Sequence, residues 1–214
     1  MVKACIFDLD GVIVDTARYH FLAWRRLARE MGFDLSKSEN ERLKGVSRMA
    51  SFDILLEIGK IELSEEEKSI KADLKNLWFV DFILTMSPND ILPGVSNFLN
   101  RLTDEGISIG LGSASKNAKT ILKQIELTNR FSAVIDGNLV STAKPDPEVF
   151  LKASEALQMV PEECVVFEDA IAGIEAAHRA GMKCIGVGDP SILRKADRVI
   201  PGFEGVGTDI LIFR

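Results

Sequence analysis

Short apolar runs alternate with helical patterns of apolar residues along most of the chain. The runs with the length and composition of buried strands cover residues 4–7, 107–111, 133–135, 165–167 and 184–187. Helical patterns lie between them, at residues 95–102, 118–125, 147–157 and 171–180. Strands that alternate with helices predict βαβ units, and therefore an α/β fold with a Rossmann-like parallel sheet covered on both faces.

The stretch from residue 16 to residue 91 interrupts this alternation, because it contains helical periodicity and no convincing strand. Apolar residues recur at helical spacing at Ala17, Phe21, Trp24, Ala28 and Met31. Gly32 follows as a helix end, and Ser64 with Glu67 forms a capping-box pattern at a helix start. We therefore expect an α/β catalytic core of residues 1–15 and 92–214, with an inserted α-helical cap of residues 16–91.

Composition and charge narrow the class of protein. Hydrophobic residues make up 46% of the chain and charged residues 27%, values typical of a globular protein. The net charge of −6 argues against sequence-independent nucleic-acid binding. Cys5, Cys164 and Cys184 form no CxxC pair and lie in apolar runs, so we expect buried, reduced thiols. No signal peptide or membrane span is visible, and we expect a cytoplasmic protein.

Pairs of acidic residues follow two of the predicted strands. Asp8 and Asp10 come directly after the first strand, where residues two apart point to the same side. Glu168 and Asp169 end another strand. Either pair alone is explained equally well as acidic residues that cap or form a turn. If a parallel sheet brings both strand ends together, four acids converge, and such hard oxygen ligands suit Mg²⁺.

Two further predicted strands lead to residues that suit a phosphate. The run at residues 107–111 continues into Gly112 and Ser113, small residues that let backbone N–H groups and a hydroxyl approach an anion. Lys144, followed by Pro145, lies in the loop after the next strand and can supply a point charge. Taken singly, Ser113 is also a common turn residue and Lys144 a common solvated charge.

These segments, in order, resemble the four motifs of the haloacid dehalogenase superfamily of phosphotransferases, over nearly the whole chain. The resemblance implies that Asp8 is the nucleophile that forms an aspartyl-phosphate and that Asp10 is the general acid and base. Ser113 and Lys144 are implied to stabilise the phosphoryl oxygens. One Mg²⁺ per subunit is implied, with ligands from Asp8, the backbone carbonyl of Asp10, Glu168 and Asp169.

A further set of residues lies mainly in the predicted cap. It consists of residues 10–16, His20, Trp24, Leu43, Lys44, Gly45, Val46, Ser47, Arg48, Ser51, Lys75 and Asn76, with Ser113, Ala114, Ser115, Lys116 and Asn117 in the core. This set resembles the β-phosphoglucomutase family within the superfamily. Gly45, Val46 and Ser47 precede a helix expected to begin near Arg48, where N–H groups and a guanidinium face one anion. Taken singly, His20 and Trp24 are better explained by packing in the core, and Arg48 by a solvated charge.

The resemblance implies interconversion of β-D-glucose 1-phosphate and D-glucose 6-phosphate, with β-glucose 1,6-bisphosphate as the priming intermediate. It also implies that His20 and Lys75 engage Asp10 when the cap closes over the sugar. Two alternatives remain at this point, a Mg²⁺-dependent sugar-phosphate phosphatase and a non-catalytic sugar-phosphate sensor. We expect a monomer whose partner is a small sugar phosphate. Ala170 departs from the family pattern, since a hydroxyl residue is usual there, and Gly112 is smaller than usual.

Overall fold

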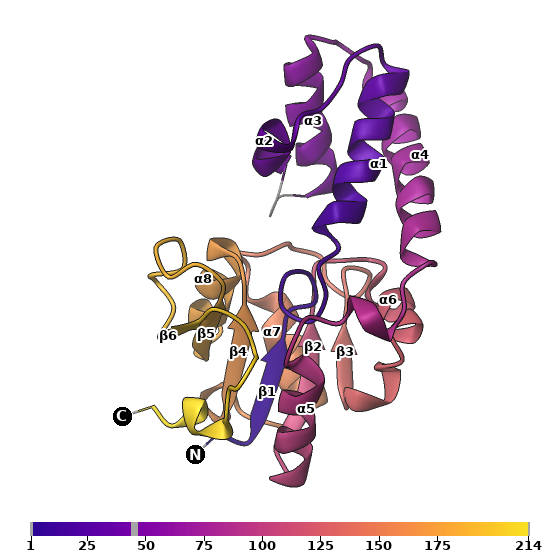
Figure 1. Cartoon of the computed structure of the whole chain (residues 1–214). Coiled ribbons are helices and arrows are strands. Elements are labelled where there is room, and N and C mark those ends of the chain that lie inside the picture. Colours follow the sequence, from indigo (N-terminus) through magenta and orange to yellow (C-terminus); the bar gives the residue numbers. More distant parts are fainter. Residues whose placement is uncertain (1, 44–46, 214) are drawn as a thin grey trace. The chain divides into compact units, whose positions relative to one another are not determined.

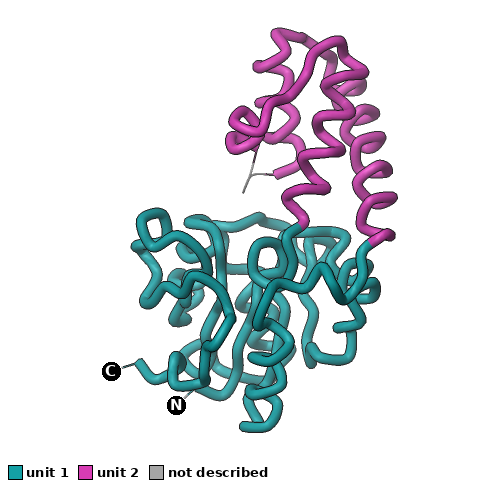
Figure 2. The backbone as a smooth tube through the Cα atoms, viewed as in Figure 1, with its two compact units in different colours: residues 1–15, 86–214 teal, residues 16–85 magenta. Residues whose placement is uncertain are grey.

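The computed structural model describes residues 2–43 and 47–213 of the chain. It contains two compact units, which Figure 2 shows in different colours. Unit 1 consists of residues 1–15 and 86–214, and unit 2 of residues 16–85. The sequence analysis placed the second boundary after residue 91, whereas the structure places residues 86–91 in unit 1. The reason is local, because Ile91 forms a β-bridge with Val14.

Within the described residues, unit 1 contains a six-stranded parallel sheet in the order β3-β2-β1-β4-β5-β6 (Figure 1). The strands are β1 (Ala4–Phe7), β2 (Ser108–Gly112), β3 (Ala133–Ile135), β4 (Cys164–Glu168), β5 (Lys183–Val187) and β6 (Arg198–Ile200). The predicted α/β fold and all the predicted strands are confirmed. The sequence analysis missed β6, because this edge strand has only Val199 and Ile200 as its apolar run.

Helices pack on both faces of the sheet, as predicted. They are α5 (Val95–Asp104), α6 (Ala118–Gln124), α7 (Glu148–Ala156) and α8 (Ile171–Arg179). Side chains of β1 alternate between the faces. Ile6 belongs to the buried cluster that contains Phe150 of α7 and Ile174 of α8. Phe7 stacks on Phe167 of β4 with ring centres 4.7 Å apart, and meets Phe98 of α5 edge-on.

The order of the strands reverses beside β1. The chain runs from β1 to β2 and β3 on one side, and then crosses to β4, β5 and β6 on the other. Phe7, the last residue of β1, pairs with Leu111 of β2 and Phe167 of β4. Ligands of such sheets bind where the order reverses, beyond the carboxyl ends of the strands. The segments that begin at Asp8, Ser113 and Glu168 all start at this edge.

Unit 2 is helical. Its helices are α1 (Ala17–Glu30), α2 (Lys37–Asn40), α3 (Arg48–Gly59) and α4 (Glu65–Ile83). The predicted capping box is confirmed at α4, because Glu67 N donates to Ser64 Oγ and Ser64 N donates to Glu67 Oε2 at 2.8 Å. α3 begins at Arg48, as predicted, and Ser47 caps it by accepting from Ala50 N. Short 3₁₀ helices lie at Glu41–Leu43, Pro88–Asp90, Thr128–Arg130, Pro161–Glu163 and Thr208–Leu211.

Aromatic residues are distributed unequally between the units. Unit 2 contains both tryptophans, Trp24 and Trp78, and the single tyrosine, Tyr19. All three are buried, and Trp24 stacks on Phe52 of α3. The core of unit 1 is built around phenylalanine instead.

The three cysteines are free and buried, which confirms the expectation of reduced, unpaired thiols in the core. Within the described ranges, no helix is both long enough and apolar enough to cross a lipid bilayer.

Candidate active site

The segment after β1 turns sharply and places Asp8 at the edge of the sheet. Asp8 N donates to Phe167 O at 2.9 Å, so the backbone pairing of β1 with β4 extends one residue beyond the strand. Gly11 then reverses the chain with φ +80°, a conformation that favours glycine. Gly11 N donates to Val14 O at 2.7 Å and closes the turn. Asp8 is 7% exposed, whereas Asp10, within the turn, is half-buried.

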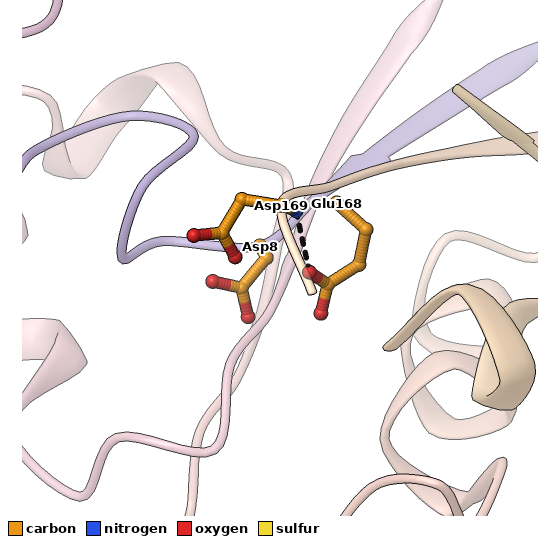
Figure 3. Close-up of side chains that lie close together, drawn as sticks. All are labelled: Asp8, Glu168 and Asp169. Atoms are coloured by element: carbon orange, nitrogen blue, oxygen red, sulfur yellow. Dashed lines mark hydrogen bonds between the residues drawn. The ribbon is translucent and has the colours of Figure 1, made fainter. Parts of the chain in front are cut away.

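Three carboxylates come together at the ends of β1 and β4 (Figure 3). Asp8, Glu168 and Asp169 each offer an oxygen within 4.8 Å of the others. Of the four acids expected to converge, these three form the cluster. The Asp10 carboxylate is outside it, although its charge raises the pKa of Asp8 and of Asp169. The ligand set implied by the family resemblance assigns a backbone carbonyl, not a carboxylate, to Asp10.

Lys144 reaches the cluster from the loop that precedes α7. Its Nζ donates to Asp8 Oδ1 and to Glu168 Oε1, the latter at 2.7 Å. The side chain is 10% exposed, and its Nζ lies 4.7 Å from the ring centre of Phe150. Gly112 leaves room for that ring, since a Cβ there would lie 2.8 Å from it. The solvated charge considered from sequence is thus a buried ion pair.

The loop that carries Lys144 is fastened by Glu148, the first residue of α7. Glu148 Oε2 accepts from Ser141 N and Thr142 N, both at 2.8 Å. The hydrogen bond from the Lys152 ammonium, followed by those from Thr142 and Ser141, lowers the pKa of Glu148 to about 2. The sequence analysis missed Glu148. The available signal was its position four residues before Lys152, the spacing of a helical ion pair.

The charges in the cluster are incompletely balanced. Burial raises the pKa of Asp8 to about 7; the Lys144 charge lowers it, and Glu168 and Asp10 raise it further. Burial, followed by the charges of Glu168 and Asp8, raises the pKa of Asp169 to about 8. For Lys144, burial acts to lower the pKa, but Asp8 and Glu168 outweigh it and the pKa is raised. The cluster thus holds three acids and one ammonium, which pairs with Asp8 and Glu168.

This arrangement fits a divalent cation. Carboxylate oxygens are the ligands that Mg²⁺ prefers, and the oxygens of Asp8, Glu168 and Asp169 are close enough to share one ion. The raised pKa values of Asp8 and Asp169 indicate negative charge that a cation would stabilise.

The loop after β2 brings a second group of predicted residues to the same edge. Ser113 is 1% exposed, and its Oγ accepts from Ser115 N at 3.1 Å. Ser115 Oγ in turn accepts from Asn117 N, just before α6 begins. Asn138 Nδ2 donates to Lys116 O at 2.9 Å and ties this loop to the turn after β3. The segment is an ordered turn that begins beside Asp8 on the neighbouring strand.

In unit 2, α1 and α4 bury a lysine among aromatic rings. Lys75 is 2% exposed, and its Nζ lies 2.9 Å from His20 Nδ1. The ammonium also lies 4.5 Å from the ring centre of Trp24 and 5.0 Å from that of Phe79. Because an ammonium can only donate, His20 accepts at Nδ1. Burial, followed by the charges of Lys75 and Arg48, lowers the pKa of His20 well below its usual value, so the ring is neutral.

His20 and Trp24, for which simple packing was the alternative considered from sequence, are therefore part of one cluster around the Lys75 ammonium. Phe79 stacks on His20 with ring centres 4.0 Å apart. The sequence analysis missed Phe79. Its position four residues after Lys75, on one face of α4, was the available signal.

The start of α3 holds another charged group. Arg48 Nη2 donates to Asn76 Oδ1 at 2.8 Å, and Nη1 lies 3.4 Å from Asp73 Oδ1. Ser51 is buried, and its hydroxyl donates to Leu43 O and Ser47 O. The predicted residues Gly45 and Val46, with Lys44, lie outside the described residues.

Comparisons with known proteins bear on both units. A family model described as hydrolase, haloacid dehalogenase-like hydrolase, matches residues 2–181. The β-phosphoglucomutase of Bacillus subtilis strain 168 is 42% identical over 201 residues, covering 93% of this chain and 89% of that protein. A phosphorylated carbohydrates phosphatase of Thermotoga maritima is 33% identical over 188 residues, covering 86% and 84%. A crystal structure of β-phosphoglucomutase from Clostridium difficile matches with a TM-score of 0.90 at 43% identity, covering 99% of this chain and 96% of that chain.

Proposed function

The chain belongs to the haloacid dehalogenase-like hydrolase family, and on that premise we propose that it is a phosphomutase for β-D-glucose 1-phosphate and D-glucose 6-phosphate. The observation that carries this proposal is the 42% identity with a β-phosphoglucomutase across 93% of the chain, cap unit included. The carboxylate cluster around Asp8 supports phosphoryl transfer as the reaction.

Asp8 is the proposed nucleophile. An Asp8 oxygen attacks the phosphorus, the bond from phosphorus to the sugar oxygen breaks, and an aspartyl-phosphate results. Lys144 favours the ionised form of Asp8 by its charge and fixes the carboxylate by donating to Oδ1. In the second half of the reaction a sugar hydroxyl attacks the same phosphorus and frees the Asp8 carboxylate.

Asp10 is the proposed general acid and base. It gives a proton to the departing sugar oxygen and later takes one from the attacking hydroxyl, so its proton count is restored over a full cycle. Ser113 and Lys144 are proposed to stabilise the phosphoryl oxygens. Asp8, Glu168 and Asp169 with the Asp10 carbonyl would hold Mg²⁺, which supplies positive charge against the phosphoryl group when bound.

The remaining residues are proposed as substrate ligands. A mutase that uses a bisphosphate intermediate needs a second place for a phosphate besides the one at Asp8. Arg48 offers a half-buried guanidinium for this purpose, and Asn76 holds it. The further proposed ligands are His20, Trp24, Gly45, Val46, Ser47, Ser51, Lys75, Ser115, Lys116 and Asn117. We propose β-glucose 1,6-bisphosphate as the priming intermediate and a monomeric, cytoplasmic enzyme.

A sugar-phosphate phosphatase is the second candidate. The 33% identity with the phosphatase of Thermotoga maritima favours it, because the same Asp8 chemistry ends in hydrolysis when water replaces the sugar hydroxyl. The two reactions differ in the acceptor of the phosphoryl group, so the products separate them.

The deciding experiment supplies β-D-glucose 1-phosphate with Mg²⁺ and a trace of the bisphosphate, and measures both possible products. The mutase predicts glucose 6-phosphate as the main product and a lag without the bisphosphate. Inorganic phosphate as the main product would refute the mutase and establish the phosphatase. No turnover of any sugar phosphate would favour the non-catalytic sensor.

Arg48→Ala tests the second phosphate site. We expect turnover of the sugar phosphate to fall by about 10²-fold, the loss of one charge-assisted contact, while hydrolysis of a small acyl phosphate is unchanged. Arg42→Ala is the matched control, because Arg42 lies nearby in the sequence and pairs with Glu57 at the surface of unit 2. Equal effects of Arg48→Ala on both substrates would contradict the assignment.

A further inference from the structure

Glu168 uses both of its carboxylate oxygens in contacts with the protein. Oε1 accepts from Lys144 Nζ at 2.7 Å. Oε2 accepts from the backbone N–H groups of Asp169 at 2.7 Å and Ala170 at 3.0 Å. The side chain is 2% exposed, so water cannot replace these partners. The orientation of this carboxylate therefore determines where the Lys144 ammonium lies, and with it the contact to Asp8.

The space for this carboxylate lies against α8. A Cβ built on Gly173 would lie 1.7 Å from Glu168 Oε1, 2.0 Å from Cδ and 2.5 Å from Cγ. Gly173 is the third residue of α8 and has an ordinary helical backbone, so no turn or left-handed conformation requires glycine there. In the interior of a helix, glycine is less stable than alanine. The missing side chain therefore needs a reason outside the helix.

We propose that Gly173 is a positioning residue for the active site: its missing Cβ keeps open the space in which the Glu168 carboxylate contacts Lys144. A methyl group at residue 173 forces the carboxylate to move. The carboxylate then loses the Lys144 contact and both N–H donors, so the substitution disrupts the geometry of the active site. Because the atoms in the way of the methyl group belong to the Glu168 side chain and not to backbone, shortening that side chain removes the obstruction.

Gly11 makes similar room for Asp169, since a Cβ there would lie 2.0 Å from Asp169 Oδ2. Gly11 has φ +80°, so a substitution would add backbone strain to the loss of space. Gly173 is the better position for a test, because a substitution there removes the space without adding backbone strain.

The test is a double-mutant cycle of Gly173→Ala and Glu168→Ala. With Glu168 present, we expect Gly173→Ala to lower the melting temperature of the protein in EDTA and to weaken Mg²⁺ binding in calorimetry by about 10-fold or more. On the Glu168→Ala background the obstructing atoms are gone. Gly173→Ala should then raise the melting temperature by roughly 1–4 °C, as an ordinary helix substitution does, and leave Mg²⁺ binding unchanged.

Gly202→Ala is the matched control, since a Cβ at Gly202 meets nothing within 4 Å. If Gly173→Ala raises the melting temperature on both backgrounds and leaves Mg²⁺ binding within about twofold of the wild type, the proposal is wrong. A Gly173→Ala protein that fails to fold, beside a folded double variant, supports it. These measurements use no sugar phosphate, so they test Gly173 whether or not the proposed substrate is correct.

Discussion

Lys144→Met removes the ammonium that Asp8 and Glu168 share and keeps a side chain of similar length against Phe150. Lys144 is 10% exposed and Glu168 is 2% exposed, so the contact between them is a buried ion pair. Removing one partner of a buried pair costs about 3–5 kcal/mol, because the other charge stays buried without compensation. We expect a loss of that size in EDTA at about pH 8, which lies above the raised pKa of Asp8, so that this carboxyl carries its charge.

The loss should shrink at lower pH. The pKa of Asp8 is raised to about 7, so at about pH 5 this carboxyl is already neutral, and loss of the Lys144 charge no longer leaves an Asp8 carboxylate unpaired. The assay is urea unfolding followed by circular dichroism at both pH values. Lys3→Met is the control, since Lys3 pairs with Glu163 at the surface and is 56% exposed, a contact of at most about 1 kcal/mol. Equal losses at the two pH values, or a loss no larger than the control, would refute the reasoning.

Three further expectations follow from the structure. Asp8→Asn should reduce turnover by at least about 10⁴-fold, since the amide cannot attack phosphorus, and turnover within tenfold of the wild type would remove Asp8 as the nucleophile. The metal-free protein should lose stability as pH rises from about 4 to 7, because the pKa of Asp8 is raised by burial and the folded state binds an extra proton there. Melting curves in EDTA test whether the melting temperature falls over this pH range. Added Mg²⁺ should stabilise the protein more at the higher pH. Ser64→Ala should cost about 1 kcal/mol through loss of the α4 cap, whereas Ser69→Ala, on the exposed surface of the same helix, should not; urea unfolding compares them.

The sequence predicted the acidic edge of the sheet for a physical reason. Parallel strands have their carboxyl ends at one edge, so residues that follow β1 and β4 had to meet once those strands were assigned. That argument places Asp8, Glu168 and Asp169. It does not place Lys144, which lies in a loop with no repeating geometry. The sequence offered Lys144 as a point charge for a phosphate, with a solvated charge as the alternative, and the family resemblance then implied its role in the site.

Contacts between side chains distant in the sequence were the least predictable. Helical spacing pairs Glu148 with Lys152 and Phe79 with Lys75, but it does not indicate that Glu148 fastens the Lys144 loop or that Phe79 lies on His20. Both of these contacts depend on how two elements pack. The role of Gly173 could not be predicted from the sequence for a related reason. The space that a missing side chain leaves can be recognised only when the neighbouring residues are in place. The edge strand β6 was too short to show a period.

Because the tryptophan and tyrosine side chains all lie in unit 2, two spectroscopic signals can distinguish unfolding of unit 2 from unfolding of the whole chain. Intrinsic tryptophan fluorescence arises from residues 16–85 alone, whereas far-ultraviolet circular dichroism reports on both units. Emission from Trp24 senses the buried Lys75 ammonium 4.5 Å away, and emission from Trp78 senses the Arg26 guanidinium 4.0 Å from its ring. Single Trp→Phe variants would separate the two signals. Unfolding of one unit can thus be followed without a label, and a ligand that changes the emission must alter the surroundings of the helical unit.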